Sequence, residues 1–453
     1  MEGIMTRTVI DVAKVIDEQR MGSLHWKVVI LSFVIMLTDG YDTVCVAYVA
    51  PLLRQEWNFS PAAFGPLFAS GLLGAALGPV LVGHLADRVG RKPIILTGTL
   101  WFGVLTLAAV FAQSLNQLMI LRFLAGLGIG GVLAIGTALV AEFAPRRIRA
   151  TMIVMGVVGV ALGGGLGGLM AALVLGHTSW HIVFWIGGLI PIALAVIGYF
   201  VFPESAKFLT LKPERWDELT KLLKILSPSL HVPADAKFVL GDEANAPKFS
   251  FKALFLGRLA AITPLLWVSN FLALLQLYFV NQWTPLLLTG QGTSVPRAAL
   301  ATAAFQICGF LGALAITRPV DRWGFAPVPA LFAVGALVVG LIGMPGGSEM
   351  WVIALSGLSG FCVIGIQFAN IASQSQVYPT YIRSWGVGVC YTFGRCGSVV
   401  GPLFAGVLVG FNVSINTLFY ISGTLMGFGF VVALVLVPLY RKQLSEMQTA
   451  QAI

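Results

Sequence analysis

The sequence predicts an all-α integral membrane protein with twelve transmembrane helices in two pseudo-symmetric six-helix halves. Three observations support this class: an apolar composition, twelve apolar segments of spanning length, and an internal repeat. Hydrophobic residues make up 57 % of the 453 residues and charged residues 10 %, whereas soluble domains carry about 45–50 % and about 25 %. A soluble fold cannot bury that much apolar surface, so the bilayer is expected to surround most of the chain.

Twelve segments can each span a bilayer, because a spanning helix needs about 20 mostly apolar residues. We expect them near residues 28–51, 64–83, 94–112, 118–141, 151–175, 181–202, 260–287, 298–317, 328–345, 350–375, 385–410 and 416–439.

These spans predict five regions along the chain. They are an N-terminal tail (1–26), a first half (27–202), a polar linker (203–258), a second half (259–440) and a C-terminal tail (441–453). Within the N-terminal tail, Val9, Val12, Ala13 and Ile16 have helical spacing, which fits either an interfacial amphipathic helix or a solvated segment. The linker is too short and too charged for a catalytic domain, and it carries a helical pattern around Arg215–Leu226.

The distribution of basic residues predicts the orientation in the membrane. With an even number of spans, both termini and the linker lie on the same side of the membrane. This side carries 24 of the 28 Lys and Arg residues. The positive-inside rule makes this side cytoplasmic, and we expect a multi-pass protein of the plasma membrane, the inner membrane of a bacterium. The net charge of +9 is therefore a topology signal and does not indicate a nucleic-acid partner.

The two halves repeat one another at an offset of 234 residues. At this offset Asp87–Gly90 aligns with Asp321–Gly324, and Glu142–Pro145 aligns with Gln376–Pro379. Charged and proline motifs rarely match at one shared offset by chance. Two six-helix halves joined by a cytoplasmic linker are typical of a transporter whose halves rock around a central site by alternating access.

Several motifs resemble those of known transporters. Gly83–Lys92 resembles the signature loop of the major facilitator superfamily, and Arg122–Gly131 and Pro203–Ser205 resemble two further motifs of that superfamily. Asp39–Asp42 (Asp-Gly-Tyr-Asp) and Gly394–Gly397 (Gly-Arg-Cys-Gly) are similar to motifs of its aromatic acid:proton symporter family. The resemblance implies the major facilitator fold and the uptake of a small aromatic carboxylate, hydroxybenzoate-like, together with protons.

Asp39 and Asp42 are the candidate proton-coupling residues. They lie three positions apart on one face of the first span, about midway through an otherwise apolar segment. An ionised aspartate there costs about 2.5–3.5 kcal/mol unless a partner or water stabilises it. Two neighbouring carboxylates would titrate as a unit, which suits a site that takes up and releases a proton. The alternative is a structural pair in which one aspartate caps a helix broken at Gly40.

Arg122 and Arg395 are the other two charges inside predicted spans. Arginine stays protonated and can bind a carboxylate bidentately. Two aspartates balance two arginines only when both aspartates are ionised. Protonation of one aspartate would then leave an arginine for an anionic substrate. The alternative is that either arginine braces helices through backbone carbonyls.

Polar and aromatic side chains of the second half are candidates to shape the substrate pocket beside these arginines. They are Gln276, Tyr278, Asn281, Gln282 and Trp283 of the seventh span, and Gln367 and Asn370 of the tenth. Each alone is more often an interhelical contact than a ligand contact, but together they suggest a polar cavity with aromatic walls.

Charged residues at the cytoplasmic ends of helices are candidate gating residues. They are Asp87, Arg88, Arg91, Glu142 and Arg149 in the first half, and Asp321, Arg322 and Arg383 in the second. We expect Asp87 to pair with basic residues of a neighbouring helix end, although Glu142 and its basic neighbours could equally be a solvated cluster. Thr317 and Gln376 depart from the superfamily pattern in the second half.

The resulting hypothesis is a proton-coupled importer of a small aromatic carboxylate that has no cofactor, is no enzyme and is expected to be a monomer. Its partners are the substrate, protons and the bilayer. One alternative is proton-coupled transport of another organic acid or of a sugar, although two buried arginines suit an anion better. The other is a membrane-bound ligand sensor, for which the sequence shows no signalling segment.

Overall fold

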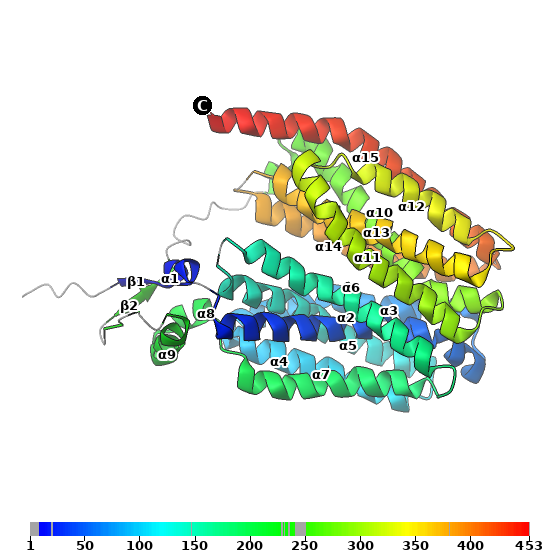
Figure 1. The fold of residues 1–453 in the computed structure, drawn as a ribbon, viewed down its shortest axis with the longest axis horizontal. Coiled ribbons are helices and arrows are strands. Elements are labelled where there is room, and N and C mark those ends of the chain that lie inside the picture. Colours follow the sequence, from blue (N-terminus) through cyan, green and yellow to red (C-terminus); the bar gives the residue numbers. More distant parts are fainter. Residues whose placement is uncertain are drawn as a thin grey trace, which may run out of the picture.

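The computed structural model describes residues 9–19, 21–145, 147–227, 230, 232–233, 236–240, 251–379 and 381–452. The described chain is almost entirely helical (Figure 1). The N-terminal half consists of α2 (Ser23–Trp57), α3 (Phe64–Val89), α4 (Arg91–Ala108), α5 (Leu115–Phe143), α6 (Arg149–Val174) and α7 (His181–Val201). The C-terminal half consists of α10 (Leu259–Gly290), α11 (Val295–Trp323), α12 (Val328–Ile342), α13 (Glu349–Val377), α14 (Arg383–Gly410) and α15 (Ile415–Ala452).

Shorter elements lie before and between the halves. They are β1 (Val9–Asp11), α1 (Val12–Glu18), α8 (Ala206–Thr210), α9 (Trp216–Leu226), β2 (Lys237–Val239) and the 3-10 turns η1 (Pro61–Ala63), η2 (Ala109–Phe111), η3 (Pro213–Arg215) and η4 (Phe251–Phe255). In Figure 1 the C-terminal half lies above the N-terminal half, and α1, α9 and both strands project beyond the bundle on the left. We call this the linker end and the opposite end of the bundle the far end.

The predicted spans correspond to twelve helices of the two halves. Eleven helices among the described residues are long and apolar enough to cross a membrane. The twelfth, α12, has 15 residues and covers only part of the predicted span 328–345. It begins after Pro327 and ends at Gly343, two residues that favour helix boundaries. At about 1.5 Å per residue it is roughly 22 Å long, and it packs against α13 and α15.

Close contacts between the two halves gather in the middle of the bundle and at the far end. A Cβ atom on Gly65, near the start of α3, would lie 2.9 Å from the Cα atom of Gly406, near the end of α14. One turn further into the bundle, the ring of Phe68 packs edge-on against Trp283 with centroids 5.5 Å apart. The side chain of Trp283 is fully buried and donates from Nε1 to the carbonyl of Pro402. Aromatic and backbone packing therefore closes the bundle at the far end.

The N-terminal segment is docked onto the linker. Strand β1 pairs in parallel with β2, with Val9 opposite Lys237 and Asp11 opposite Val239. Asp11 caps α1 by accepting from the backbone amides of Ala13 and Lys14. The apolar face of α1 is buried, with Val12 0 % exposed. The helical spacing in this segment thus reflects packing on the chain's own linker, and the expectation of a solvated tail is wrong for residues 9–19.

Candidate functional site

The motif Asp39–Asp42 lies in the middle of α2, where α2 packs closely on α6. A Cβ atom at Gly40 would collide with the backbone carbonyl of Val160, so only glycine allows this approach. Tyr41 donates its hydroxyl hydrogen to the carbonyl of Val183 on α7. These two contacts fix the rotation of α2 and leave both aspartates buried, with Asp39 2 % and Asp42 3 % exposed.

Asp42 forms a buried ion pair with Arg122 of α5. Nη1 of Arg122 lies 3.1 Å from one carboxylate oxygen of Asp42 and 3.2 Å from the other. Thr106 of α4 completes a triangle, because it accepts from Nη2 of Arg122 at 2.9 Å and donates to Asp42 at 2.5 Å. The guanidinium carbon also lies 5.3 Å from the centroid of the Phe184 ring, a cation–π contact. All four residues belong to the N-terminal half, so this network holds that half together.

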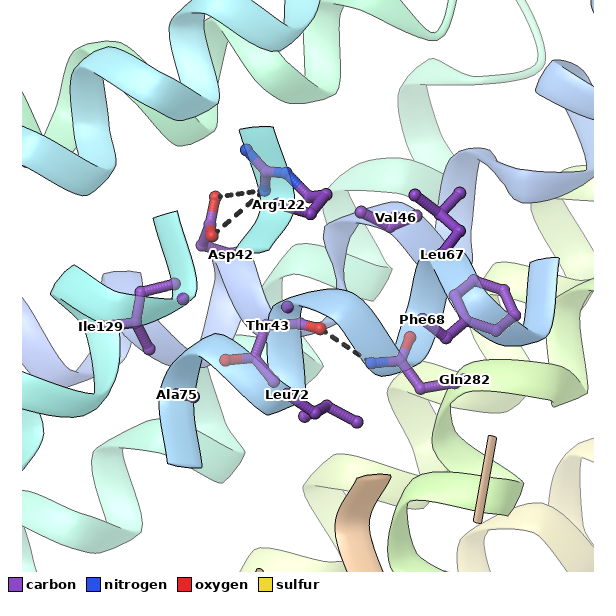
Figure 2. A pocket seen from close by; sticks show the side chains of 12 residues that line it. Asp42, Thr43, Val46, Leu67, Phe68, Leu72, Ala75, Arg122, Ile129 and Gln282 are labelled. Carbon is purple, nitrogen blue, oxygen red and sulfur yellow. Dashed lines mark hydrogen bonds and ion pairs between the residues drawn. The ribbon is translucent and has the colours of Figure 1, made fainter. Parts of the chain in front are cut away.

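A small cavity lies beside this ion pair (Figure 2). It measures about 30 Å³ and is lined by Asp42, Arg122 and apolar side chains of α3 and α5. Gln282 of α10 closes it from the other half by donating from Nε2 to the carbonyl of Thr43 at 3.0 Å (Figure 2). One water occupies roughly 10–15 Å³ of such a volume. The space beside Arg122 therefore suits water and is too small for an aromatic acid.

Asp39 lies in different surroundings, between the two halves. Its carboxylate accepts from the hydroxyl of Thr43 at 3.4 Å and interacts electrostatically with Arg395 of α14. Arg395 is partly buried and donates from Nη2 to the hydroxyl of Tyr391, one turn earlier on α14. Its guanidinium carbon lies 4.9 Å from the centroid of that ring, and Tyr278 of α10 interacts with Arg395 electrostatically. The site thus joins an aspartate of one half to an arginine and two tyrosines of the other.

The remaining residues predicted to line the pocket divide into two groups. Gln276 and Trp283 are engaged in packing between helices: Gln276 donates to Ser422 at 2.5 Å, although its Oε1 has no partner among the described residues, and Trp283 donates to Pro402 as described above. Asn281, Gln367 and Asn370 are buried, yet each has a side-chain amide atom without a hydrogen-bond partner among the described residues. Asn370 also accepts from Ser269 at 3.1 Å. Buried amide groups with spare capacity can bind a polar ligand.

A second polar network lies at the linker end of the N-terminal half. Glu204, just before α8, accepts from the backbone amides of Arg91 and Lys92 at 2.9 and 3.1 Å. It thereby satisfies the free amides at the start of α4, where the helix dipole favours a negative charge. Gly90 precedes them with a φ of +112°, a backbone conformation that favours glycine. Arg91 also pairs with Glu142 at 2.8 Å, and Glu142 accepts from Ser205 at 2.5 Å.

The other predicted gating residues are placed as follows. Asp87, Arg88, Asp321 and Arg322 are exposed, and no ion pair of Asp87 is found in the described part of the chain. Arg149 pairs with Asp17 of α1 at 3.3 Å. Arg383 donates from Nε to the carbonyl of Tyr378. Gln376, which stands where an acidic residue is usual, accepts from Tyr440 at 3.0 Å. The expected Asp87 pairing is therefore not formed in this structure, and Arg91 and Glu142 are paired instead.

Several residues of these networks were not predicted as site residues from the sequence, among them Thr106, Tyr391 and Glu204. Thr106 lies in a plain apolar run and gave no signal. Tyr391 lies four positions before Arg395, a spacing that places both on one helix face, so it could have been found. Glu204 belongs to the motif Pro203–Ser205, but its partners at the start of α4 are more than 100 positions away.

Comparison with known proteins agrees with the motifs. The family model of the major facilitator superfamily matches residues 29–380 and 266–449. The chain is 34 % identical to a gallate transporter of Pseudomonas putida, over 91 % of this chain and 92 % of the relative. It is 33 % identical to the 4-hydroxybenzoate transporter PcaK of the same species, over 88 % and 90 %. A benzoate transport protein of Acinetobacter baylyi is 30 % identical over 88 % and 87 %.

Solved structures share the fold at low sequence identity. The D-xylose-proton symporter has a TM-score of 0.68 at 17 % identity, covering 91 % of this chain and 97 % of that one. A bacterial homologue of the lysosomal transporter Spinster, described as inward-facing and unoccupied, has a TM-score of 0.65 at 16 % identity, covering 94 % and 98 %. The chain therefore belongs to the major facilitator superfamily and, within it, to the aromatic acid transporter family that its motifs predicted.

Proposed function

We propose that this protein imports a small aromatic carboxylate together with protons, and that Asp39 and Arg395 couple the two fluxes. The observation that carries the proposal is that Asp39 is buried, forms no ion pair among the described residues, and interacts electrostatically with Arg395 of the other half. Support for the substrate class comes from the gallate, 4-hydroxybenzoate and benzoate transporters among its relatives.

The coupling follows from charge balance at Arg395. An ionised Asp39 neutralises the guanidinium, which is costly to leave unpaired in a membrane core. When Asp39 takes up a proton, the guanidinium lacks a counter-ion and attracts the carboxylate of the substrate, which it can bind with paired N–H donors. When the substrate leaves, the guanidinium of Arg395 again lacks a counter-ion. Asp39 then releases its proton, because the ionised carboxylate neutralises the guanidinium. Substrate and proton therefore bind and leave together.

The second aspartate and arginine have a different role in this proposal. Asp42 and Arg122 neutralise one another within one half, and the cavity beside them has room only for water. We infer that this pair stabilises the N-terminal half, so that Arg395 is the arginine that meets the substrate. The predicted joint titration of Asp39 and Asp42 stays a prediction.

Alternating access would move the two halves against one another. The far end is closed by the contacts of Gly65 with Gly406 and of Phe68 with Trp283. With the linker end on the cytoplasmic side, as the basic residues predict, a closed far end is what the inward-facing state requires. Opening to the other side would break these far-end contacts and bring the exposed Asp87 toward the other half.

The test is transport by purified protein in proteoliposomes with radiolabelled 4-hydroxybenzoate. Asp39→Asn should abolish accumulation driven by a pH gradient, while exchange of labelled for unlabelled substrate continues, because asparagine imitates the protonated side chain. Asp217→Asn, the same change on the exposed face of α9, should leave both activities unchanged. Gradient-driven accumulation by Asp39→Asn at the wild-type level would overturn the coupling role. Failure of the wild type to transport any of gallate, 4-hydroxybenzoate and benzoate would overturn the substrate class.

A further inference from the structure

A second and larger cavity lies at the linker end, away from Asp39 and Arg395. It measures about 390 Å³ and lies between α1 on one side and α4, α5, α6 and α8 on the other. On the side of α1 its walls are Val12, Ala13 and Ile16, and Ala138 and Ala141 form the wall on α5. This linker-end cavity has the size of pockets that bind small molecules, about 300–1,000 Å³.

The charged walls of the linker-end cavity are mostly cationic. Among the described residues, Arg91, Arg149 and Lys207 line it together with a single carboxylate, Glu142. Arg91 is paired with Glu142 at 2.8 Å, and Arg149 with Asp17 at 3.3 Å. Each guanidinium carries several N–H donors in a planar fork, and the described contacts of these two side chains use only part of them. An anion can therefore be bound without breaking either ion pair.

The N-terminal segment forms the wall of the cavity that faces away from the membrane helices. Pairing of β1 with β2 holds α1 in place, and Leu240 directly after β2 also lines the cavity. The side chain of Arg149 is 37 % exposed, so the cavity reaches the surface beside α1. Its composition of apolar walls with a cationic edge matches a molecule that has an apolar body and one negative group.

We propose that the linker-end cavity is a binding site for a small organic carboxylate with an apolar body. The apolar body lies against Val12, Ile16 and Ala138, and the carboxylate faces Arg91, Arg149 and Lys207. This site is separate from the proposed transport site, because its lining residues belong to the N-terminal half, the N-terminal segment and the linker. A carboxylate there shares Arg149 with Asp17 of α1, which links occupancy of the site to the docking of α1.

Equilibrium dialysis of the purified full-length protein with radiolabelled benzoate tests the proposal. Wild-type protein should bind two benzoates, one at each site, and Arg395→Gln should retain one. Ala13→Trp fills the linker-end cavity from α1, so the double variant Arg395→Gln/Ala13→Trp should bind none. The matched control Arg395→Gln/Lys14→Trp places the same ring on the exposed face of α1 and should still bind one.

A milder pair of variants guards against misfolding. In the Arg395→Gln background, Lys207→Gln should weaken benzoate binding at least fivefold, whereas Lys212→Gln, in the same part of the linker but outside the cavity, should not. Benzamide has the shape without the charge, and inorganic phosphate has charge without an apolar body. Neither should displace benzoate from Arg395→Gln protein.

The possible results separate this proposal from the transport mechanism. Loss of all benzoate binding in Arg395→Gln, unchanged binding after Ala13→Trp, or displacement by phosphate would each overturn the linker-end site. A single benzoate in both wild type and Arg395→Gln, removed by Ala13→Trp, would support the linker-end site and contradict Arg395 as the substrate partner.

Discussion

Arg122 approaches both carboxylate oxygens of Asp42 through the same nitrogen, Nη1, at 3.1 and 3.2 Å. Both side chains are almost fully buried, and Thr106 bonds to each of them. Asp39, one turn away on α2, forms no ion pair among the described residues. Its carboxylate accepts from Thr43 and interacts electrostatically with Arg395 of the other half. Of two aspartates three positions apart, Asp42 thus stabilises the N-terminal half and Asp39 lies at the interface between the halves.

If Asp42 and Arg122 stabilise the N-terminal half, each single substitution should destabilise the protein and the double substitution should restore most of its stability. Arg122→Met or Asp42→Leu alone should lower the free energy of unfolding by about 3–5 kcal/mol, because each leaves a buried charge unpaired. The double variant Asp42→Leu/Arg122→Met should recover most of that loss, since a buried ion pair replaced by apolar groups is often neutral. Thermal unfolding in detergent measures it. A double variant as unstable as the sum of the single variants would contradict this account.

Arg395 should discriminate the charge of the substrate. Arg395→Lys keeps the charge but loses the planar fork, so binding of the acid should weaken by about 1–3 kcal/mol. Arg395→Gln should weaken it further and should leave binding of an amide analogue almost unchanged. Competition by 4-hydroxybenzoate and 4-hydroxybenzamide against labelled substrate measures both affinities at equal protein levels. If Arg395→Gln lowers the affinity for the acid and for the amide by the same factor, Arg395 braces helices, and Arg122 becomes the candidate partner of the carboxylate.

Gly40 should tolerate no side chain. Gly40→Ala places a Cβ atom against the carbonyl of Val160, which forces α2 away from α6 and disturbs both aspartates. We expect poor expression and loss of uptake. Gly427→Ala on α15 is the matched control, because a Cβ atom there meets no other atom within 4 Å. Alanine also favours the helix by roughly 0.5–1 kcal/mol over glycine, so this control should be at least as stable as wild type. Equal uptake by both variants would disprove the close approach at Gly40.

The orientation in the membrane can be measured by cysteine labelling. In a background without the five native cysteines, Ser294→Cys at the far end should react with an impermeant thiol reagent added outside intact cells. Lys224→Cys on α9 should react only after the cells are opened. Ser294 is exposed, has a φ of −65° and makes no side-chain capping bond to α11, so the nearly isosteric change disturbs neither the backbone nor the helix end. Labelling of Lys224→Cys in intact cells would reverse the predicted topology.

The sequence by itself determined the class, the spans and the family. Apolar segments of about 20 residues allow few structures in a bilayer, because every backbone polar group must be bonded within the segment. Charged residues are costly there, so Asp39, Asp42, Arg122 and Arg395 stand out against the apolar background by their positions in the chain alone. The repeat at 234 residues and the motifs then identified the fold.

Only the tertiary structure decided which of these charges meet. Helical spacing places Asp39 and Asp42 on one face of α2, but it cannot say which helices lie opposite each of them. With Gly40 packed on Val160, Asp42 bonds to Arg122 of α5 and Thr106 of α4, whereas Asp39 interacts electrostatically with Arg395 of α14. The docking of α1 on the linker could not be predicted from the sequence either, because parallel pairing of β1 with β2 joins segments more than 200 residues apart. The local sequence shows where a charge must be buried at a cost in free energy. Contacts between distant helices determine which partner offsets that cost.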